Sequence, residues 1–102
     1  MAQLQVTFLP QAELDLADIE ERIRLNNGAF VAVRNITAIL EKIDLLASAP
    51  GLGRARTMID DIEFSFFVVK RWYIVYHVAK EQNFLVVQRI VSTDYYNQFV
   101  KP

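Results

Sequence analysis

The sequence predicts an α+β fold: an N-terminal strand, an antiparallel α-helical hairpin packed on a small antiparallel β-sheet, and a short C-terminal helix. From residue 10 to residue 48 the apolar residues recur with the period of a helix, and from residue 62 they follow the alternation of strands. One proline and two glycines separate the two parts at residues 49–53. A chain of 102 residues is long enough for one core, so we expect a single domain over residues 1–102.

The first segment alternates apolar and polar residues, with Leu4, Val6 and Phe8 on one side, which is the pattern of a half-buried strand. Pro10 then favours the start of a helix, because a proline in the first helical turn loses no N–H that the helix needs. The Asn-Asn-Gly run at residues 26–28 tolerates left-handed backbone geometry and predicts the end of this helix.

This first helix has an apolar stripe and an acidic side. The apolar stripe consists of Ala12, Leu16, Ile19 and Ile23. The carboxylates that we expect to face water are Glu13, Asp15, Asp18, Glu20 and Glu21. The earliest of them also suit the positive end of the helix dipole.

A second helical pattern covers roughly residues 29–48 and ends before Pro50. Its apolar side consists of Ala32, Val33, Ile36, Ile39, Leu40, Ile43 and Leu46. Because only a short link joins the two helices, they should form an antiparallel hairpin.

Three segments rich in β-branched and aromatic residues follow, at residues 62–69, 72–79 and 84–91. We expect them to form an antiparallel meander with turns at residues 70–71 and 80–83. The Lys-Arg pair of the first turn has a low propensity for a two-residue hairpin, which favours a longer connection there.

A short last helix is expected after Thr93, which is a suitable N-cap. It would present Tyr95, Tyr96, Phe99 and Val100. The strand at residues 62–69 is apolar on both sides, so the sheet face away from the hairpin must be buried by another element or another chain. The terminal helix, a second copy of the chain and another protein are the three candidates.

Composition limits the cellular compartments and the kinds of binding site that we expect. There is no cysteine and only one histidine, so a disulfide framework and a Cys- or His-based metal site are not expected. No apolar run approaches the ~20 residues of a membrane span, and the N-terminus lacks the basic and apolar regions of a signal peptide. We therefore expect a cytoplasmic protein with no membrane contact, no metal and no cofactor.

The formal net charge is −1, so the chain as a whole is not strongly basic. The basic residues of its second half form a modest cluster: Arg54, Arg56, Lys70, Arg71 and Arg89. Such a cluster is compatible with a nucleic-acid partner and does not require one.

Four motifs recur in order along almost the whole chain. They are residues 8–19 (FLPQAELDLADI), residues 46–54 (LASAPGLGR), residues 73–76 (YIVY) and residues 87–90 (VQRI). In this order and spacing they resemble the RelE/ParE superfamily, the small toxins of bacterial toxin–antitoxin pairs. The resemblance implies a small antiparallel sheet packed on a helical hairpin, toxin function, and a cognate antitoxin as partner.

The superfamily divides into toxins that cleave messenger RNA on the ribosome and ParE-like toxins that act on DNA gyrase. The ribonuclease branch commonly has an arginine where this chain has Tyr73, and basic residues or histidine where it has Ser92 and Thr93. The Tyr-x-x-Tyr strand and the Arg-Ile pair of the last motif are more similar to the ParE-like branch. The resemblance therefore implies a toxin that inhibits DNA gyrase, serves plasmid stabilisation and is not an enzyme.

Two alternatives remain open. One is a RelE-like, ribosome-dependent mRNA endoribonuclease. The other is a non-toxic member of the superfamily, which is consistent with the missing basic residues after the last strand.

Candidate contacts to the target or the antitoxin are Arg54, Arg56, Arg71, Tyr73, Arg89, Tyr95, Tyr96 and Phe99. For a ribonuclease, the catalytic candidates would be Arg54, Arg56, Arg89 and Tyr96. RNA cleavage through the ribose 2′-hydroxyl needs a base, an acid and cations that stabilise the phosphate charge.

Several of these residues also have a structural interpretation. The arginines of residues 54–56 are equally consistent with solvated loop cations, and the terminal aromatics with packing of the last helix on the sheet. Arg89 should project to the sheet face opposite Ile90, while His77, as a lone strand histidine, is more typical of a structural role. A homodimer and a toxin–antitoxin hetero-oligomer are both open.

Overall fold

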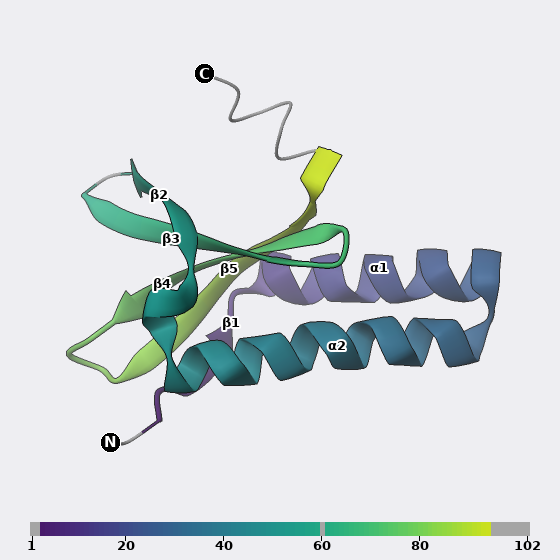
Figure 1. Cartoon of the computed structure of the whole chain (residues 1–102), viewed down its shortest axis with the longest axis horizontal. Helices are drawn as coiled ribbons and strands as arrows, with labels where there is room; N and C mark the ends of the chain where they lie inside the picture. Colours follow the sequence, from purple (N-terminus) through teal and green to yellow (C-terminus); the bar gives the residue numbers. More distant parts are fainter. Residues whose placement is uncertain (1–2, 60, 95–102) are drawn as a thin grey trace.

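The computed structural model describes residues 3–59 and 61–94, which form a helical hairpin against one face of a five-stranded sheet (Figure 1). In chain order the elements are β1 (Gln5–Phe8), α1 (Pro10–Asn27), α2 (Ala29–Ser48), the short 3₁₀ helix η1 (Pro50–Leu52), β2 (Arg54–Ile59), β3 (Ile62–Val69), β4 (Trp72–Ala79) and β5 (Phe84–Ser92). The predicted α+β fold, with its N-terminal strand and its helical hairpin on a sheet, is confirmed.

Gly28 alone separates α1 from α2. Its φ of 94° lies in the region that side chains other than glycine rarely adopt, and its N–H donates to the Arg24 carbonyl at 3.0 Å. The chain therefore reverses within one residue, and the two helices run antiparallel as predicted (Figure 1).

The sheet is mixed, whereas the sequence predicted an antiparallel one. Its strand order is β1-β5-β4-β3-β2, and β1 pairs parallel with β5, with Gln5 opposite Phe84 and Phe8 opposite Val87. The other three pairings are antiparallel. The direction of β1 relative to β5 depends on where the helical hairpin returns the chain to the sheet. Local sequence patterns do not reveal this.

The strand β2 was not predicted. Its residues (Arg-Ala-Arg-Thr-Met-Ile) lack a clear apolar alternation, and a shift in its register with β3 falls between Arg54 and Thr57. Charged residues and bulges are typical of edge strands, because both discourage pairing with a further chain.

The turn between β3 and β4 contains only Lys70 and Arg71, so the longer connection favoured by propensity is wrong. Lys70 takes a positive φ of 54°, which a two-residue hairpin needs. At the other end of β4, Asn83 takes a φ of 63°, a conformation that asparagine adopts readily.

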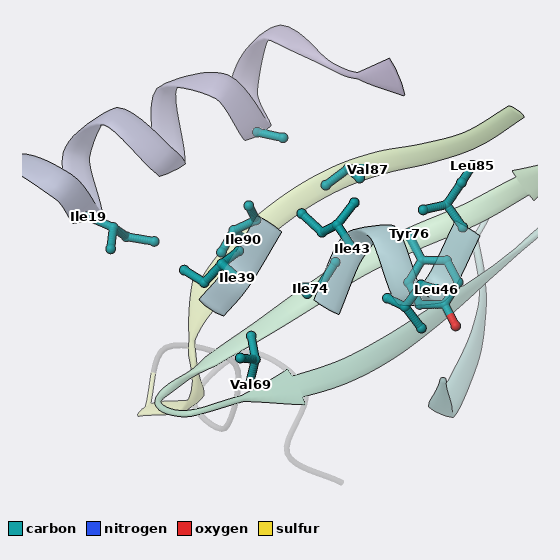
Figure 2. Close-up of a cluster of buried hydrophobic side chains, with 11 residues drawn as sticks. Ile19, Ile39, Ile43, Leu46, Val69, Ile74, Tyr76, Leu85, Val87 and Ile90 are labelled. Carbon is teal, nitrogen blue, oxygen red and sulfur yellow. The ribbon is translucent and has the colours of Figure 1, made fainter. Parts of the chain in front are cut away.

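The core lies between the hairpin and the sheet (Figure 2). It is built from Ala12 and Ile19 of α1, Ile39, Ile43 and Leu46 of α2, and Val69, Ile74, Tyr76, Leu85, Val87 and Ile90 of the sheet. Side chains of a strand alternate between faces, so the residues between these core positions lie on the opposite face, which neither helix covers.

The predicted C-terminal helix lies outside the described residues, apart from its first positions at Thr93 and Asp94. Among the described residues, no helix is both long and apolar enough to cross a membrane.

Candidate functional site

The glycine-rich turn and the central strand meet in the folded protein. Tyr76 is fully buried, and its hydroxyl donates a hydrogen bond to the Pro50 carbonyl oxygen at 2.6 Å. Gly53 lies directly against that hydroxyl, and a Cβ at this position would overlap it and approach the Ser65 Cβ to 2.9 Å. The turn is therefore held against β4, which fixes the place where β2 begins.

The uncovered face of the sheet is aromatic and apolar. Phe66 of β3 and Tyr73 of β4 meet edge to face with ring centroids 6.3 Å apart, and Phe64 meets His77 in the same way at 5.3 Å. Val75 lies opposite Phe66 in the strand register. Edge-to-face pairs are the preferred arrangement of aromatic rings, so this aromatic face, defined by Phe64, Phe66, Tyr73, Val75 and His77, is pre-formed. Phe64 and Phe66 are themselves buried, at 8% and 7% exposed, while Tyr73, Val75 and His77 are half-buried.

His77 does not add a positive charge to the aromatic face at neutral pH. Burial lowers the pKa of His77 below its ordinary value of 6.5, and hydrogen bonding to Gln88 opposes this shift only in part. Gln88 is available for this contact because β5 has a bulge there: Val75 pairs with Arg89 and Tyr76 pairs with Val87, which leaves Gln88 without a counterpart on β4.

Arg89 is engaged by a carboxylate of α1. Its Nε donates to Asp15 Oδ2 at 2.8 Å and its Nη2 donates to Asp15 Oδ1 at 3.1 Å. The backbone N–H of Ile90 donates to the same carboxylate at 2.9 Å. Arg89 pairs with Val75 and alternates with the buried Ile90, in agreement with the predicted face, and its guanidinium reaches the Asp15 carboxylate of α1.

The expectation that Asp15 faces water is therefore wrong, because its side chain is only 11% exposed. The sequence did contain a signal that Asp15 would be buried. Asp15 lies three residues after Ala12 and four before Ile19, which places it on the same helix face as these buried residues. It is also the aspartate of the Ala-x-x-Asp-Leu-x-x-Ile motif.

A concavity of about 330 Å³ lies beside this ion pair, between α1 and the ends of β4 and β5. Its apolar lining includes Ile23 and Trp72, and Arg22, Arg89 and Ser92 contribute polar groups. This volume is at the lower limit of small-molecule pockets and fits a partner's side chain better than a substrate.

The structure brings together only part of the predicted contact set. Tyr73 lies on the aromatic face, and Arg71 is exposed in the turn just before it. The backbones of Arg54 and Arg56 lie in the edge strand β2. Tyr95, Tyr96 and Phe99 lie outside the described residues.

The structure also describes only part of the predicted catalytic set. Of Arg54, Arg56, Arg89 and Tyr96, the structure describes only the side chain of Arg89, and Asp15 binds it. Among the described residues, no cluster of three or more histidines, aspartates or glutamates could hold a metal ion. The arrangement described is suited to binding a partner.

Two solved structures with this fold come from toxin–antitoxin systems. One, the chromosomal ParDE toxin–antitoxin system from P. aeruginosa, has a chain that superimposes with a TM-score of 0.71 at 15% identity, covering 88% of this chain and 96% of that one. Another is the RelBE2 toxin–antitoxin complex from Mycobacterium tuberculosis, with a TM-score of 0.67 at 17% identity, covering 90% and 93%. At these identities the likeness concerns the fold. No curated protein matches the chain by sequence comparison.

The family match is more specific than the structural likeness. The model of the ParE toxin of the type II toxin–antitoxin system parDE matches residues 6–94, from β1 to the last described residue. That span includes the helical hairpin, all five strands from Val6 onward, the Tyr76–Pro50 contact and the Asp15–Arg89 pair. The chain therefore belongs to the ParE toxin family of type II toxin–antitoxin systems.

Proposed function

We propose that this protein inhibits DNA gyrase and is neutralised by a cognate antitoxin. Its membership of the ParE toxin family supports the toxin role. The observation that supports this mode of action is the aromatic face, where the half-buried Tyr73, Val75 and His77 lie beside the buried rings of Phe64 and Phe66 and no described free cation is present. Such a surface favours binding to a protein, because aromatic side chains are enriched among the residues that dominate protein interfaces.

The same surface argues against messenger RNA cleavage. A ribonuclease needs cations beside the scissile phosphate and a proton acceptor within hydrogen-bond reach of the 2′-hydroxyl. Here Tyr73 stands where the ribonuclease branch commonly has an arginine, and Asp15 neutralises Arg89. His77 is neutral at pH 7 and packs against Phe64.

The target contact is proposed at the end of the sheet where β3 turns into β4. Arg71 is exposed there and Tyr73 lies two residues further on. The Thr93 N–H donates to the Arg71 carbonyl at 2.8 Å, so the aromatic residues at 95, 96 and 99 follow directly from this end in the sequence. Arg54 and Arg56 are proposed to contribute from the edge strand.

The antitoxin is proposed to bind as an extended segment that becomes ordered on the toxin. An apolar surface that one chain leaves uncovered is a suitable site for such a segment. The assembly would then be a toxin–antitoxin hetero-oligomer, and its action on gyrase would take place in the cytoplasm.

Induction of the chain alone in bacteria tests the target. We expect growth to stop and a DNA-damage response to appear, while incorporation of labelled amino acids continues for the first minutes. Co-expression of a cognate antitoxin should restore growth. Collapse of incorporation within minutes would instead indicate messenger cleavage. Unimpeded growth with folded protein present would favour the non-toxic alternative.

A matched pair of charge reversals tests the site. Arg71→Glu alters the exposed cation of the β3–β4 turn, and Lys80→Glu makes the same change in the exposed turn at the other end of β4. In a supercoiling assay with purified gyrase, we expect the concentration for half-inhibition to rise at least ~10-fold for Arg71→Glu, about 1.4 kcal/mol of binding. Lys80→Glu should leave it unchanged. Equal effects of the two variants would contradict the proposed site.

A further inference from the structure

The bulge of β5 gives His77 a polar neighbour. Gln88 is the additional residue of this bulge, and His77 lies opposite Val86, two residues before it. The side chain of Gln88 hydrogen-bonds with His77, which raises the pKa of His77 against the larger effect of burial. A regular strand would place its residues one for one against β4, so this contact depends on the bulge.

Two atoms of this contact are buried and have no other partner. Among the described residues, His77 Nδ1 and Gln88 Oε1 are the buried side-chain nitrogen and oxygen atoms without a further hydrogen bond. Buried polar atoms in folded proteins nearly always have a partner, so these two satisfy each other. An amide oxygen can only accept a hydrogen bond, and the ring nitrogen is therefore the donor.

The contact decides which ring nitrogen of His77 carries the proton. Burial lowers the pKa of His77 below its ordinary value of 6.5, so the imidazole is neutral at pH 7.5 and has a single N–H. With this N–H on Nδ1, the other nitrogen, Nε2, has a lone pair and no proton. His77 is half-buried and Nδ1 is its buried nitrogen, so the Nε2 side of the ring faces outward.

The other side chains around His77 are apolar. Phe64 of β3 meets its ring edge to face, and Val86 lies opposite it on β5. Val75 and Ala79, two residues before and after it on β4, lie on the same face. A partner that covers this part of the sheet would remove Nε2 from water. An acceptor that is buried without a donor weakens binding, so such a partner needs to supply one.

We infer that Gln88 holds the proton of the neutral His77 ring on Nδ1, and that Nε2 accepts a hydrogen bond from an N–H or O–H group of gyrase. This inference rests on the proposed function, in which Tyr73 belongs to the target contact. Tyr73, Val75 and His77 alternate along one face of β4, so a partner seated on Tyr73 continues onto His77. His77 then determines specificity, because a partner segment without a donor at this position binds less well.

Nitrogen NMR of the untagged, ¹⁵N-labelled full chain at about pH 7.5 tests the position of the proton. The chain has one histidine, so both imidazole nitrogen signals belong to His77. We expect the Nδ1–H form in the unsubstituted chain, and a shift toward the Nε2–H form in Gln88→Leu, which removes the acceptor. The matched control is Gln82→Leu, the same change in the exposed β4–β5 turn, which should leave the signals unchanged.

This measurement does not involve gyrase, so it tests the first half of the inference by itself. A proton on Nε2 in the unsubstituted chain would overturn the inference. A Gln88→Leu variant that keeps the proton on Nδ1 would also overturn it, because Gln88 would then not be the residue that holds it there.

A supercoiling assay with purified gyrase tests the contact. His77→Phe keeps a ring beside Phe64 and removes the acceptor, so the concentration for half-inhibition should rise at least ~10-fold. His77→Gln offers an amide oxygen at a reach similar to that of Nε2 and should remain within ~3-fold of the unsubstituted protein. Circular dichroism verifies that each variant is folded.

The outcomes separate this inference from the proposed function. If the unsubstituted chain inhibits gyrase and His77→Phe inhibits it equally well, the inference is wrong and the proposed function stands. Equal weakening by His77→Phe and His77→Gln would assign the effect to packing of the ring and would also overturn the inference. An unsubstituted chain that does not inhibit gyrase would overturn the proposed function and the contact with it.

Discussion

Gly53 is the position where one added methyl group has the largest predictable effect. The Gly53→Ala side chain would overlap the Tyr76 hydroxyl, which is fixed on the Pro50 carbonyl. Overpacking and the loss of this hydrogen bond together should lower the free energy of unfolding by about 2–4 kcal/mol. Urea denaturation of the purified variant measures this loss.

Gly51→Ala is the matched control, because no atom lies within 4 Å of the added Cβ. Gly51→Ala should change the free energy of unfolding by less than ~0.5 kcal/mol. A Tyr76→Phe background, which removes the obstructing oxygen, should reduce the cost of Gly53→Ala. An unchanged cost in that background would show that the clash is not with the hydroxyl.

His77 should make stability depend on pH. Because burial lowers its pKa below 6.5 in the folded protein, the unfolded chain binds a proton more readily between these two values. The contribution is fully present above pH 6.5 and is lost as the pH falls toward the folded-state pKa. We expect the urea midpoint to decrease between pH 7.5 and 5.5, and to decrease less for His77→Leu. A His77→Leu variant with the same slope would assign the pH dependence to other groups.

At the scale of elements, Asp15 joins α1 to an edge of the sheet. The strand β1 pairs with β5 only as far as Val87, so no strand of the described residues lies beside the rest of that edge of β5. The α1 carboxylate accepts the Ile90 N–H from this edge and holds Arg89 as well. A sheet edge capped in this way is also protected from pairing with a further chain.

Asp15→Ala should therefore destabilise the protein by about 2–3 kcal/mol, because it leaves a backbone N–H and a half-buried guanidinium without their acceptor. Asp18→Ala removes the exposed partner of Arg22, one turn further along α1, and should cost well under ~1 kcal/mol. Thermal or urea denaturation of both variants makes the comparison. Similar losses would mean that the β5 edge does not need the carboxylate.

At the scale of the whole molecule, stability should decrease from the centre of the sheet to its edges. The strand β4 is hydrogen-bonded on both sides and carries the buried Ile74 and Tyr76, whereas β2 is an edge. Native-state amide exchange should be slowest in β4 and at least ~10-fold faster in β2. Equal protection of β2 in the isolated protein would mean that another chain covers that edge.

The sequence by itself determined the elements whose signals are local. The limits of α2 and of β3 and β4 follow from Gly28, Pro50 and the change of hydrophobic period, because helices and strands bury their faces with different spacings. The family resemblance also rested on short motifs, and the family match over residues 6–94 confirms it.

Only the tertiary structure decided what those motifs do. The parallel pairing of β1 with β5, the Tyr76–Pro50 bond and the capture of Arg89 by Asp15 join residues far apart in the chain. The bulge at Gln88 depends on the register with β4, and the edge strand β2 exists through its pairing with β3. Such contacts depend on which surfaces meet once the hairpin packs on the sheet, and residue spacing along one chain does not specify this.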